Sequence, residues 1–392
     1  MNGLKQRLAN FLKYNKYAYA IYYFVVSLFI NFLKLFIKTD DKLILFNSFA
    51  GRKYDDSPKA IFEAMKADLR FADYRIIWAF HQPEKFQVEG AEKIRTDGFQ
   101  YFKTALSARV WVTNSSVERG LHFKGKNTFY LNTWHGSPIK KMGSDISTDN
   151  QSFGTKSENL VDIMNTQSYF EAEIFSRCFG IPRDHFLEVG LPRNDELVSY
   201  TEEHRGELKR RLGIPTKKKV LLYCPTFREY EKDENHGVVL APPMDLKKWE
   251  RILGDQFILL FRAHYEVSKV MEIEENEFVR NVTDYPSLND LMIVSDILIS
   301  DYSSIFFDYS IMDKGMLHFT YDYDKYQKKR GMYFDVRDCI DGGANEDEVI
   351  AVIKELNEEK SIYRTRLFRK KYMNFYGSAA KKTVDCIADH IL

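Results

Sequence analysis

Short apolar runs with strand character alternate with helical segments along most of the chain, and this alternation limits the possible folds more than any other feature. The first four runs are LILFNSF (43–49), RIIWAF (75–80), ARVWVTNS (108–115) and TFYLNTW (128–134). A helix is predicted after the first run, because Ser57 and Pro58 supply an N-cap and a proline at the first helical position. Strands that alternate with helices in this way are typical of a parallel sheet covered by helices.

A second series of the same kind begins near residue 205 with the charged helical segment RGELKRRLGIP. Its strand-like runs are KKVLLYCPTF (218–227), FILLFRAH (257–264) and DILISDYSS (296–304). At 392 residues the chain is long enough for two domains, each with its own core. We therefore predict an α/β protein in three parts: a membrane-associated helical segment over 1–38, an N-terminal Rossmann-like domain over 39–204 and a C-terminal Rossmann-like domain over 205–392.

The charge argues against a nucleic-acid-binding protein, and the cysteine spacing argues against a zinc-binding or CxxC redox protein. The net charge is +1, so no global positive field attracts nucleic acid, and no nucleic-acid partner is expected. The four cysteines have neither CxxC nor zinc-binding spacing. Cys224 and Cys386 lie in apolar surroundings, and we interpret them as small buried hydrophobic residues of a reducing compartment.

The most apolar stretch of the chain is YAYAIYYFVVSLFINFLKLFI, at residues 17–37. Its length matches a membrane span of about 20 residues. Asn31 and Lys34 interrupt its C-terminal half, and tyrosines, which favour the level of the lipid headgroups, cluster in its first half. We therefore prefer an in-plane helix on an anionic membrane surface over a transmembrane span or a helix buried in the protein. The stretch is preceded by no acidic residue and by four basic ones, Lys5, Arg7, Lys13 and Lys16. Such a basic flank suits both membrane interpretations.

The first candidate site lies in NTWHGSPIKKMG, which follows the strand-like run 128–134. Ligands of doubly wound sheets bind beyond the carboxyl ends of the strands, so this turn is expected to face the cleft between the halves. His135 held there would take a proton from a hydroxyl near neutral pH. Gly136 permits a close approach of the backbone, and Pro138 can start a helix. The alternative is a histidine that only satisfies the core at a turn.

Two further strand ends carry basic side chains. In YCPTFRE (223–229), a proline ends the sheet pairing and aims Thr226 and Arg228 at the cleft, where Arg228 would bind a phosphate through two guanidinium nitrogens. In FRAH, Arg262 and His264 alternate, so both point to one face and suit a diphosphate. The alternatives are a surface ion pair for Arg228 and a solvated pair for Arg262 and His264.

The stretch SDYSSIFFDYS (300–310) combines a strand end with a helix start. Ser303, Ser304 and the first free amides would form an anion site at the helix N-terminus. Asp308, one turn further on, would accept hydrogen bonds from hydroxyls of the donor. The alternative is a double N-cap without a ligand. The DxD sequence at 322–324 is interpreted as a surface loop, and neither a metal site nor a cofactor is predicted.

In their order and spacing, WHGSPIKKMG, YCPTFRE, FRAH and SDYSSIFFDYS resemble the motifs of the CDP-glycerol:poly(glycerophosphate) glycerophosphotransferase family of wall teichoic acid synthesis. The similarity extends from about Leu43 to the C-terminus. It implies a glycosyltransferase-B-like fold, in which two Rossmann-like domains face each other across a cleft. It also implies CDP-glycerol as the donor substrate and peripheral attachment to the cytoplasmic face of the bacterial cell membrane.

The resemblance also implies roles for individual residues. His135 matches the catalytic base, and His264 matches a second histidine near the donor phosphates. Together with the strand-end analysis, it gives a donor side and an acceptor side of the cleft. The expected donor-binding residues are Thr226, Arg228, Arg262, Ser303, Ser304 and Asp308, and the expected acceptor-side residues are Trp134, Gly136 and Lys140.

The compact length is most like the primase of the family, which adds the first glycerol phosphate to an undecaprenyl-diphosphate-linked disaccharide and releases CMP. A poly(glycerol phosphate) or poly(ribitol phosphate) polymerase of the same family is the first alternative. A UDP-sugar glycosyltransferase on the same fold is the second, and a non-enzymatic membrane scaffold is the third. The sequence predicts no oligomeric state.

Overall fold

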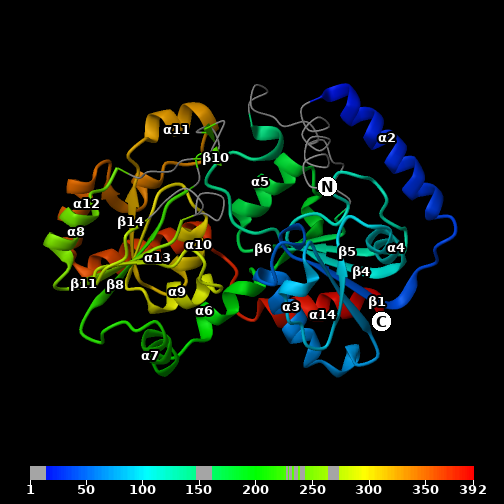
Figure 1. The fold of residues 1–392 in the computed structure, drawn as a ribbon, viewed down its shortest axis with the longest axis horizontal. Coiled ribbons are helices and arrows are strands. Elements are labelled where there is room, and N and C mark those ends of the chain that lie inside the picture. Colours follow the sequence, from blue (N-terminus) through cyan, green and yellow to red (C-terminus); the bar gives the residue numbers. More distant parts are fainter. Residues whose placement is uncertain are drawn as a thin grey trace.

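The structure, a computed structural model, contains two parallel β-sheets that lie side by side, each covered by helices (Figure 1). It describes residues 15–146, 161–226, 228, 232–233, 237–238, 243–263 and 273–392. Both sheets have their first strand in the middle, between the second and the fourth, which is the doubly wound arrangement. The two Rossmann-like halves predicted from the alternation of strands and helices are therefore present.

The N-terminal sheet has seven strands in the order β3-β2-β1-β4-β5-β6-β7, and all its pairings are parallel. Along β1, Leu43 and Leu45 pack into the core on one face, while Ile44 and Phe46 pack into the core on the other. A strand buried on both faces needs a continuous apolar run, which is what LILF provides. The strands are β1 (Asp40–Asn47), β2 (Arg75–Phe80), β3 (Glu92–Arg95), β4 (Ala108–Thr113), β5 (Phe129–Asn132), β6 (Ile163–Thr166) and β7 (Phe186–Glu188).

In the described part of this half, residues 39–146 and 161–204, four complete α-helices lie between or after the strands. Among them, α3 begins directly before the predicted Ser57-Pro58 start, and α5 has Ser168 as its N-cap, whose side chain accepts from the amide of Glu171. The four helices are α3 (Asp56–Lys66), α4 (Phe99–Ser107), α5 (Tyr169–Phe179) and α6 (Asp195–Ser199).

The C-terminal sheet has six parallel strands in the order β12-β11-β8-β13-β14-β15. Its strands are β8 (Lys219–Cys224), β11 (Phe257–Phe261), β12 (Val279–Asn281), β13 (Ile297–Ser300), β14 (Gly315–Phe319) and β15 (Asp341–Gly343). A short antiparallel pair, β9 (Lys232–Asp233) and β10 (Gly237–Val238), lies apart from it. The helices are α7 (Glu202–Arg211), α8 (Leu246–Leu253), α9 (Leu288–Val294), α10 (Ile305–Ser310), α11 (Tyr323–Arg330), α12 (Glu346–Lys354) and α13 (Glu358–Tyr372).

The last helix, α14 (Ala379–Ile391), packs on the N-terminal half, against α3 (Figure 1). Val384 and Ile387 are part of the core of that half, and Asn165 in β6 donates to the Thr383 hydroxyl at 2.7 Å. The domain predicted to run from 205 to 392 is therefore shorter than expected. Residues 379–391 belong with the N-terminal half, because their apolar face completes the core beneath its sheet.

The apolar stretch near the N-terminus forms the helix α2 (Lys16–Leu33), which runs along the outer side of the N-terminal half (Figure 1). Ile30 is buried, and the Asn31 side-chain amide donates to the His122 carbonyl at 3.1 Å. Within the described ranges, the structure contains no helix with the length and apolar character needed to cross a bilayer. Many large apolar side chains of this segment are exposed: Tyr17, Ile21, Tyr22, Phe24, Val25, Leu28, Phe29, Phe32, Leu35 and Phe36.

Two backbone segments, 139–141 and 331–333, tie the halves together. Lys140 and Met332 form an antiparallel bridge. The amide of Lys141 donates to the Gly331 carbonyl at 3.0 Å, and the amide of Tyr333 donates to the Ile139 carbonyl at 2.8 Å. The chain directly after His135 is therefore attached to the C-terminal half.

Candidate active site

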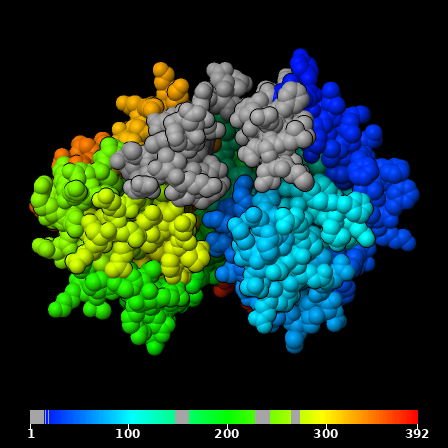
Figure 2. Space-filling model, viewed as in Figure 1, coloured from blue at the N-terminus to red at the C-terminus, as the bar shows by residue number. Residues whose placement is uncertain are grey.

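A cavity of about 700 Å³ lies between the two halves, at the carboxyl ends of both sheets. Figure 2 shows the halves on either side of this boundary. Residues of both halves line the cavity, so a ligand bound there would contact both domains. Those used below are Asp56, His135 and Arg193 from the N-terminal half, and Arg262, Ser303, Ser304 and Asp308 from the C-terminal half.

His135 lies in the turn that follows β5 and lines the cavity, as predicted. Its Nδ1 is 2.7 Å from the carbonyl oxygen of Asn114. A carbonyl can only accept, so Nδ1 carries the proton and Nε2 keeps its lone pair. Desolvation lowers the pKa of His135 from its usual 6.5, while the hydrogen bond to the Asn114 carbonyl and the nearby Asp56 carboxylate oppose this effect. The neutral imidazole needed by a general base is therefore the favoured form near pH 7.

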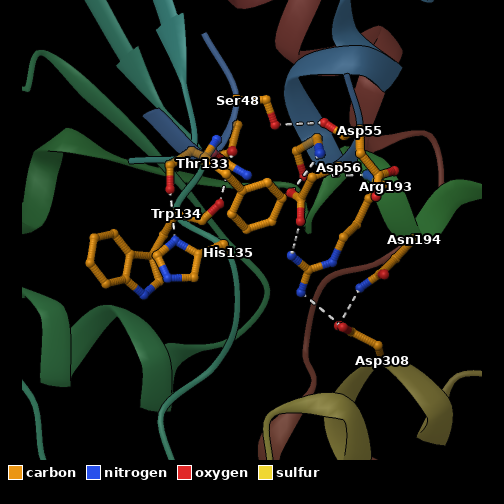
Figure 3. A network of polar contacts seen from close by, with 12 residues as sticks. Ser48, Asp55, Asp56, Thr133, Trp134, His135, Arg193, Asn194 and Asp308 are labelled. Atoms are coloured by element: carbon orange, nitrogen blue, oxygen red, sulfur yellow. Dashed lines mark hydrogen bonds and ion pairs between the residues drawn. The ribbon is translucent and has the colours of Figure 1, made fainter. Parts of the chain in front are cut away.

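Trp134 holds the His135 ring in place. The two rings stack at 4.4 Å between centroids with an interplanar angle of 27° (Figure 3). The backbone of Trp134 has φ 52°, a left-handed conformation that is costly for a bulky residue. Its amide donates to Asn132 Oδ1 at 2.8 Å, which helps to fix this conformation. Trp134 also packs against Phe175 and Phe179, so it supports the turn that contains His135 and does not line the cavity.

Gly136 brings this turn into contact with the C-terminal half. A Cβ atom added at this position would lie 2.4 Å from Ser304 Oγ and 2.8 Å from Ser304 Cβ. Only glycine fits at such a distance. Lys140, the third predicted acceptor-side residue, lies at the bridge to Met332 and is not part of the cavity lining.

On the donor side, Ser303, Ser304 and Arg262 line the cavity. Arg262 Nη1 donates to the carbonyl of Tyr285 at 2.7 Å, which fixes the position of the guanidinium. Desolvation lowers the pKa of Arg262 below its usual value, but the group remains a cation. His264, the predicted second catalytic residue, lies outside the described residues.

Asp308 is buried, and its carboxylate is already bound by the N-terminal half (Figure 3). Arg193 Nη2 donates to Oδ2 at 2.8 Å, and Asn194 Nδ2 donates to Oδ1 at 2.7 Å. Arg193 also pairs with Asp56 at 2.9 Å. Asp56, Arg193 and Asn194 were not predicted from the sequence. The same signal that singled out Arg228, a proline at a strand end followed by an arginine, also occurs in VGLPRND.

Arg228 and Thr226 do not line the cavity. The Arg228 side chain is fully buried and forms ion pairs with Asp301 at 2.9 Å and Asp322 at 2.7 Å. Its guanidinium also lies 5.1–5.2 Å from the ring centroids of three tyrosines, a cation–π arrangement: Tyr302, Tyr321 and Tyr326. The geometry therefore gives Arg228 a structural role and does not support a direct contact with a donor phosphate. Thr226 donates its amide to Asp301 at 2.9 Å.

Asp322 of the DxD sequence accepts from Arg228 and from the Tyr302 hydroxyl, so it is not the solvated loop residue expected from sequence. Within the described ranges, no three His, Cys, Asp or Glu side chains gather closely enough to hold a metal ion.

The chain is similar to proteins of one family over most of its length. The model of the family described as CDP-Glycerol:Poly(glycerophosphate) glycerophosphotransferase matches residues 29–389. A teichoic acid glycerol-phosphate transferase of Staphylococcus aureus is 32% identical over 375 residues, which cover 90% of this chain and 95% of that protein. A teichoic acid poly(glycerol phosphate) polymerase of Staphylococcus epidermidis is 34% identical over 315 residues, but the chain spans only 43% of its length.

The fold is similar to that of a protein of known structure. The wall teichoic acid polymerase TagF superimposes with a TM-score of 0.81 at 30% identity, and the match covers 90% of each chain. A structure of a TagF variant has also been determined after a soak with CDPG.

Proposed function

Because the chain belongs to the CDP-glycerol:poly(glycerophosphate) glycerophosphotransferase family, and is therefore a transferase of teichoic acid synthesis, we propose that it moves glycerol phosphate from CDP-glycerol to a hydroxyl of a lipid-linked acceptor. The acceptor proposed is an undecaprenyl-diphosphate-linked disaccharide. One observation carries the proposal: His135, whose Nε2 is unprotonated, lines one cavity together with Ser303, Ser304 and Arg262 of the C-terminal half.

The proposed step is a direct displacement at the β-phosphorus of CDP-glycerol. His135 Nε2 removes the proton of the acceptor hydroxyl, and the oxygen forms a bond to the β-phosphorus. The bond between this phosphorus and the oxygen that bridges to the α-phosphorus breaks, and CMP leaves with the bonding electrons. General base catalysis of this kind contributes about 10²–10⁴-fold to the rate.

The donor diphosphate would contact Ser303, Ser304 and Arg262, with His264 assigned to the same side by family resemblance. Hydroxyl donors and a fixed arginine cation stabilise charge on the equatorial oxygens, and phosphoryl transfer depends mainly on such positioning and electrostatics. Arg228 and Asp308 are left out of this contact set, because their charged groups are bound by other protein side chains.

The chain is further proposed to attach to the cytoplasmic face of the membrane as a peripheral protein, through α2. The support is the apolar surface of this helix: Phe24, Leu28 and Phe32 are 67%, 63% and 56% exposed. An apolar helix face of this kind binds the interface between headgroups and acyl chains. Replacing Phe24, Leu28 and Phe32 by serine should release the protein from liposomes, whereas Leu69→Ser, at an exposed apolar residue outside α2, should not. Unchanged sedimentation of the triple variant would place the attachment elsewhere.

The deciding experiment supplies the purified protein with CDP-glycerol and a synthetic lipid-linked disaccharide, and resolves products by the number of phosphates added. CMP release that requires the acceptor supports the proposal, and His135→Ala should lose at least about 100-fold in kcat. One added phosphate indicates a primase-like enzyme, and a ladder of products indicates a polymerase. Thermal stabilisation by a UDP-sugar but not by CDP-glycerol would contradict the proposed donor.

A further inference from the structure

The turn at 192–195, which follows β7 and includes the first residue of α6, lies where the two halves meet. Three consecutive side chains in it contact different parts of the molecule. Arg193 reaches Asp56 at the start of α3 and Asp308 in α10. Asn194 reaches Asp308 and Gln167. Asp195 accepts from the first amides of α14, those of Ala379 and Ala380, at 2.8 Å each. The turn is therefore a junction between both halves and the returning helix.

Arg193 forms the charged part of this junction (Figure 3). Nη1 donates to Asp56 Oδ2 at 2.9 Å, and Nη2 donates to Asp308 Oδ2 at 2.8 Å. The side chains of Arg193, Asp56 and Asp308 are only 13%, 8% and 4% exposed. A planar guanidinium that binds two carboxylates at once fixes their relative position as well as their charge. Removing one member would leave a buried charge without its counter-ion.

Asp56 is positioned for this contact by an unusual backbone. Its φ is 66°, and its second carboxylate oxygen accepts from the amide of Ser57 at 2.6 Å. A left-handed aspartate at a helix start carries a conformational cost, and such residues persist where surrounding contacts hold them. The Arg193 ion pair is one such contact, and it holds the Asp56 carboxylate at the cavity wall next to His135.

Asn194 begins a chain of hydrogen bonds that ends beside the catalytic turn. Its Nδ2 donates to Asp308 Oδ1 at 2.7 Å and to Gln167 Oε1 at 3.1 Å. Gln167 Nε2 donates to Ser137 Oγ at 2.6 Å, and Ser137 donates to Glu171 at 3.1 Å. All members of this chain are buried. Ser137 is two residues beyond His135, so α10 of the C-terminal half is linked through side chains to the turn that holds the base.

The network holds the His135 turn close to the residues that precede α10. Gly136 and Ser304 approach so closely that a single methyl group would not fit between them. Ser304 directly precedes α10, which carries Asp308. A displacement of α10 relative to the turn by even about 1 Å would change how the acceptor hydroxyl meets the donor phosphorus, and such errors can cost about 100-fold in rate.

We infer that Arg193 is a positioning residue of the transfer reaction: through Asp308 and Asp56 it sets the register between the His135 turn and the donor side of the cavity. Arg193 takes no part in proton transfer or in bond breaking. Its role differs from that of the segments 139–141 and 331–333, which hold the halves together but do not contact α10 through Asp308. The inference rests on the proposed transfer from CDP-glycerol.

The test compares Arg193→Gln, Arg193→Lys and Asp308→Asn with the wild type, measuring kcat for CMP release in the presence of acceptor and the dissociation constant of CDP-glycerol by calorimetry. For Arg193→Gln, kcat should fall about 100-fold while the donor dissociation constant changes less than about threefold. Arg193→Lys should recover part of the loss, because an ammonium group still binds one carboxylate but lacks the fork. Arg183→Gln is the matched control, since Arg183 lies nearby in sequence and pairs only within its own half, with Glu188.

A double-mutant cycle decides whether Arg193 acts through Asp308. If it does, Arg193→Gln combined with Asp308→Asn should be no slower than the worse single variant. Losses that multiply would overturn the inference, and so would an unchanged kcat in Arg193→Gln or a donor affinity that falls as much as kcat does. Circular dichroism and thermal unfolding establish whether each variant is folded. If Arg193→Gln does not fold, the comparison is made with Arg193→Lys. A wild type that releases no CMP would instead contradict the proposed function.

Discussion

At the scale of single residues, the site depends on how charged and polar groups are paired across the cleft. His135 has its tautomer fixed by the Asn114 carbonyl and its ring held by Trp134. Asp56, Arg193 and Lys140 are the charged groups that act on its pKa, after the larger effect of desolvation. Asp56 and Arg193 lie far from His135 in sequence, so the basicity of His135 depends on the folded cleft.

The acidic limb of the pH profile should report this base. The pKa of His135 is lowered from 6.5, and a base works only in its neutral form, so activity should decline as the pH falls through a value below 6.5. The profile of kcat/KM measures this midpoint for the free enzyme. The limb should be missing from any residual activity of His135→Gln, and a midpoint above 6.5 in the wild type would contradict the assignment.

Glu171 gives a second prediction, on stability. Burial raises its pKa from 4.5 to about 7, against the hydrogen bonds from Gln167, Thr166 and Ser137. A raised pKa means that the folded state binds the proton more tightly. The stability from this proton is fully present below pH 4.5 and is lost as the pH rises to about 7.

Glu171→Gln should therefore be more stable than the wild type at pH 8, by up to about 3 kcal/mol, and the difference should shrink toward pH 5. Glutamine fits the site, because its amide can donate to Ser137 Oγ while its oxygen accepts from the other two donors. Urea unfolding at several pH values measures the difference. Glu173→Gln, on the exposed side of α5, is the control and should show no such pH dependence.

At the scale of elements, the apolar runs of the sequence predicted the central strands well, and the peripheral strands poorly. LILFNSF became β1, and DILISDYSS became β13 followed by the turn with Ser303 and Ser304. Central parallel strands are buried on both faces and need continuous apolar runs, so they are visible in sequence. Strands such as β3 and β15 are short and polar, and their pairing depends on neighbours that the sequence does not reveal.

The site was predicted to the same degree and for related reasons. His135, Arg262, Ser303 and Ser304 all line the cavity, because a strand end places a turn reliably. Arg228 also follows a strand, but its partners Asp301 and Asp322 come from later turns of the sheet and draw it into the core. No local pattern around residue 228 distinguishes these outcomes. Arg193 was missed because β7 is only three residues long.

The contact between the His135 turn and the start of α10 gives a prediction at this scale. Gly136→Ala should destabilise the protein by about 1–3 kcal/mol, since the new methyl group would overlap Ser304. Adding Ser304→Gly should restore much of the stability, because it removes both of the close atoms. Thermal unfolding of the two single variants and the double variant measures this. If the stability changes of the two single variants simply add in the double variant, the steric contact between residues 136 and 304 is not the cause of the loss.

At the scale of the whole molecule, α14 connects the end of the described chain to its beginning. The helix leaves the C-terminal half and fills the core beneath the N-terminal sheet, where Ile387 is completely buried. The chain therefore crosses between the two halves twice, once at the turn 192–195 and once in the segment that leads into α14. The predicted boundary at 204/205 describes only the first of these crossings.

Ile387→Ala should destabilise the N-terminal half although the residue comes late in the sequence. Removing a fully buried isoleucine side chain costs about 2–5 kcal/mol. Hydrogen exchange should then increase in β1 and α3, which surround the same core, more than in β8 or β13. Asp389→Ala, on the exposed side of α14, is the control. Faster exchange confined to the C-terminal half would contradict the placement of α14.

The return of α14 also has a consequence for how the protein is made. A ribosome releases the strands β1 to β7 long before Val384 and Ile387, which complete the hydrophobic core of that half. Domains of nascent chains commonly fold in order from the N-terminus. Here the N-terminal half must wait with part of its core open until the C-terminal half has been synthesised, so the second half is free to reach its native state first. The cleft, which needs both, can form only as the last step.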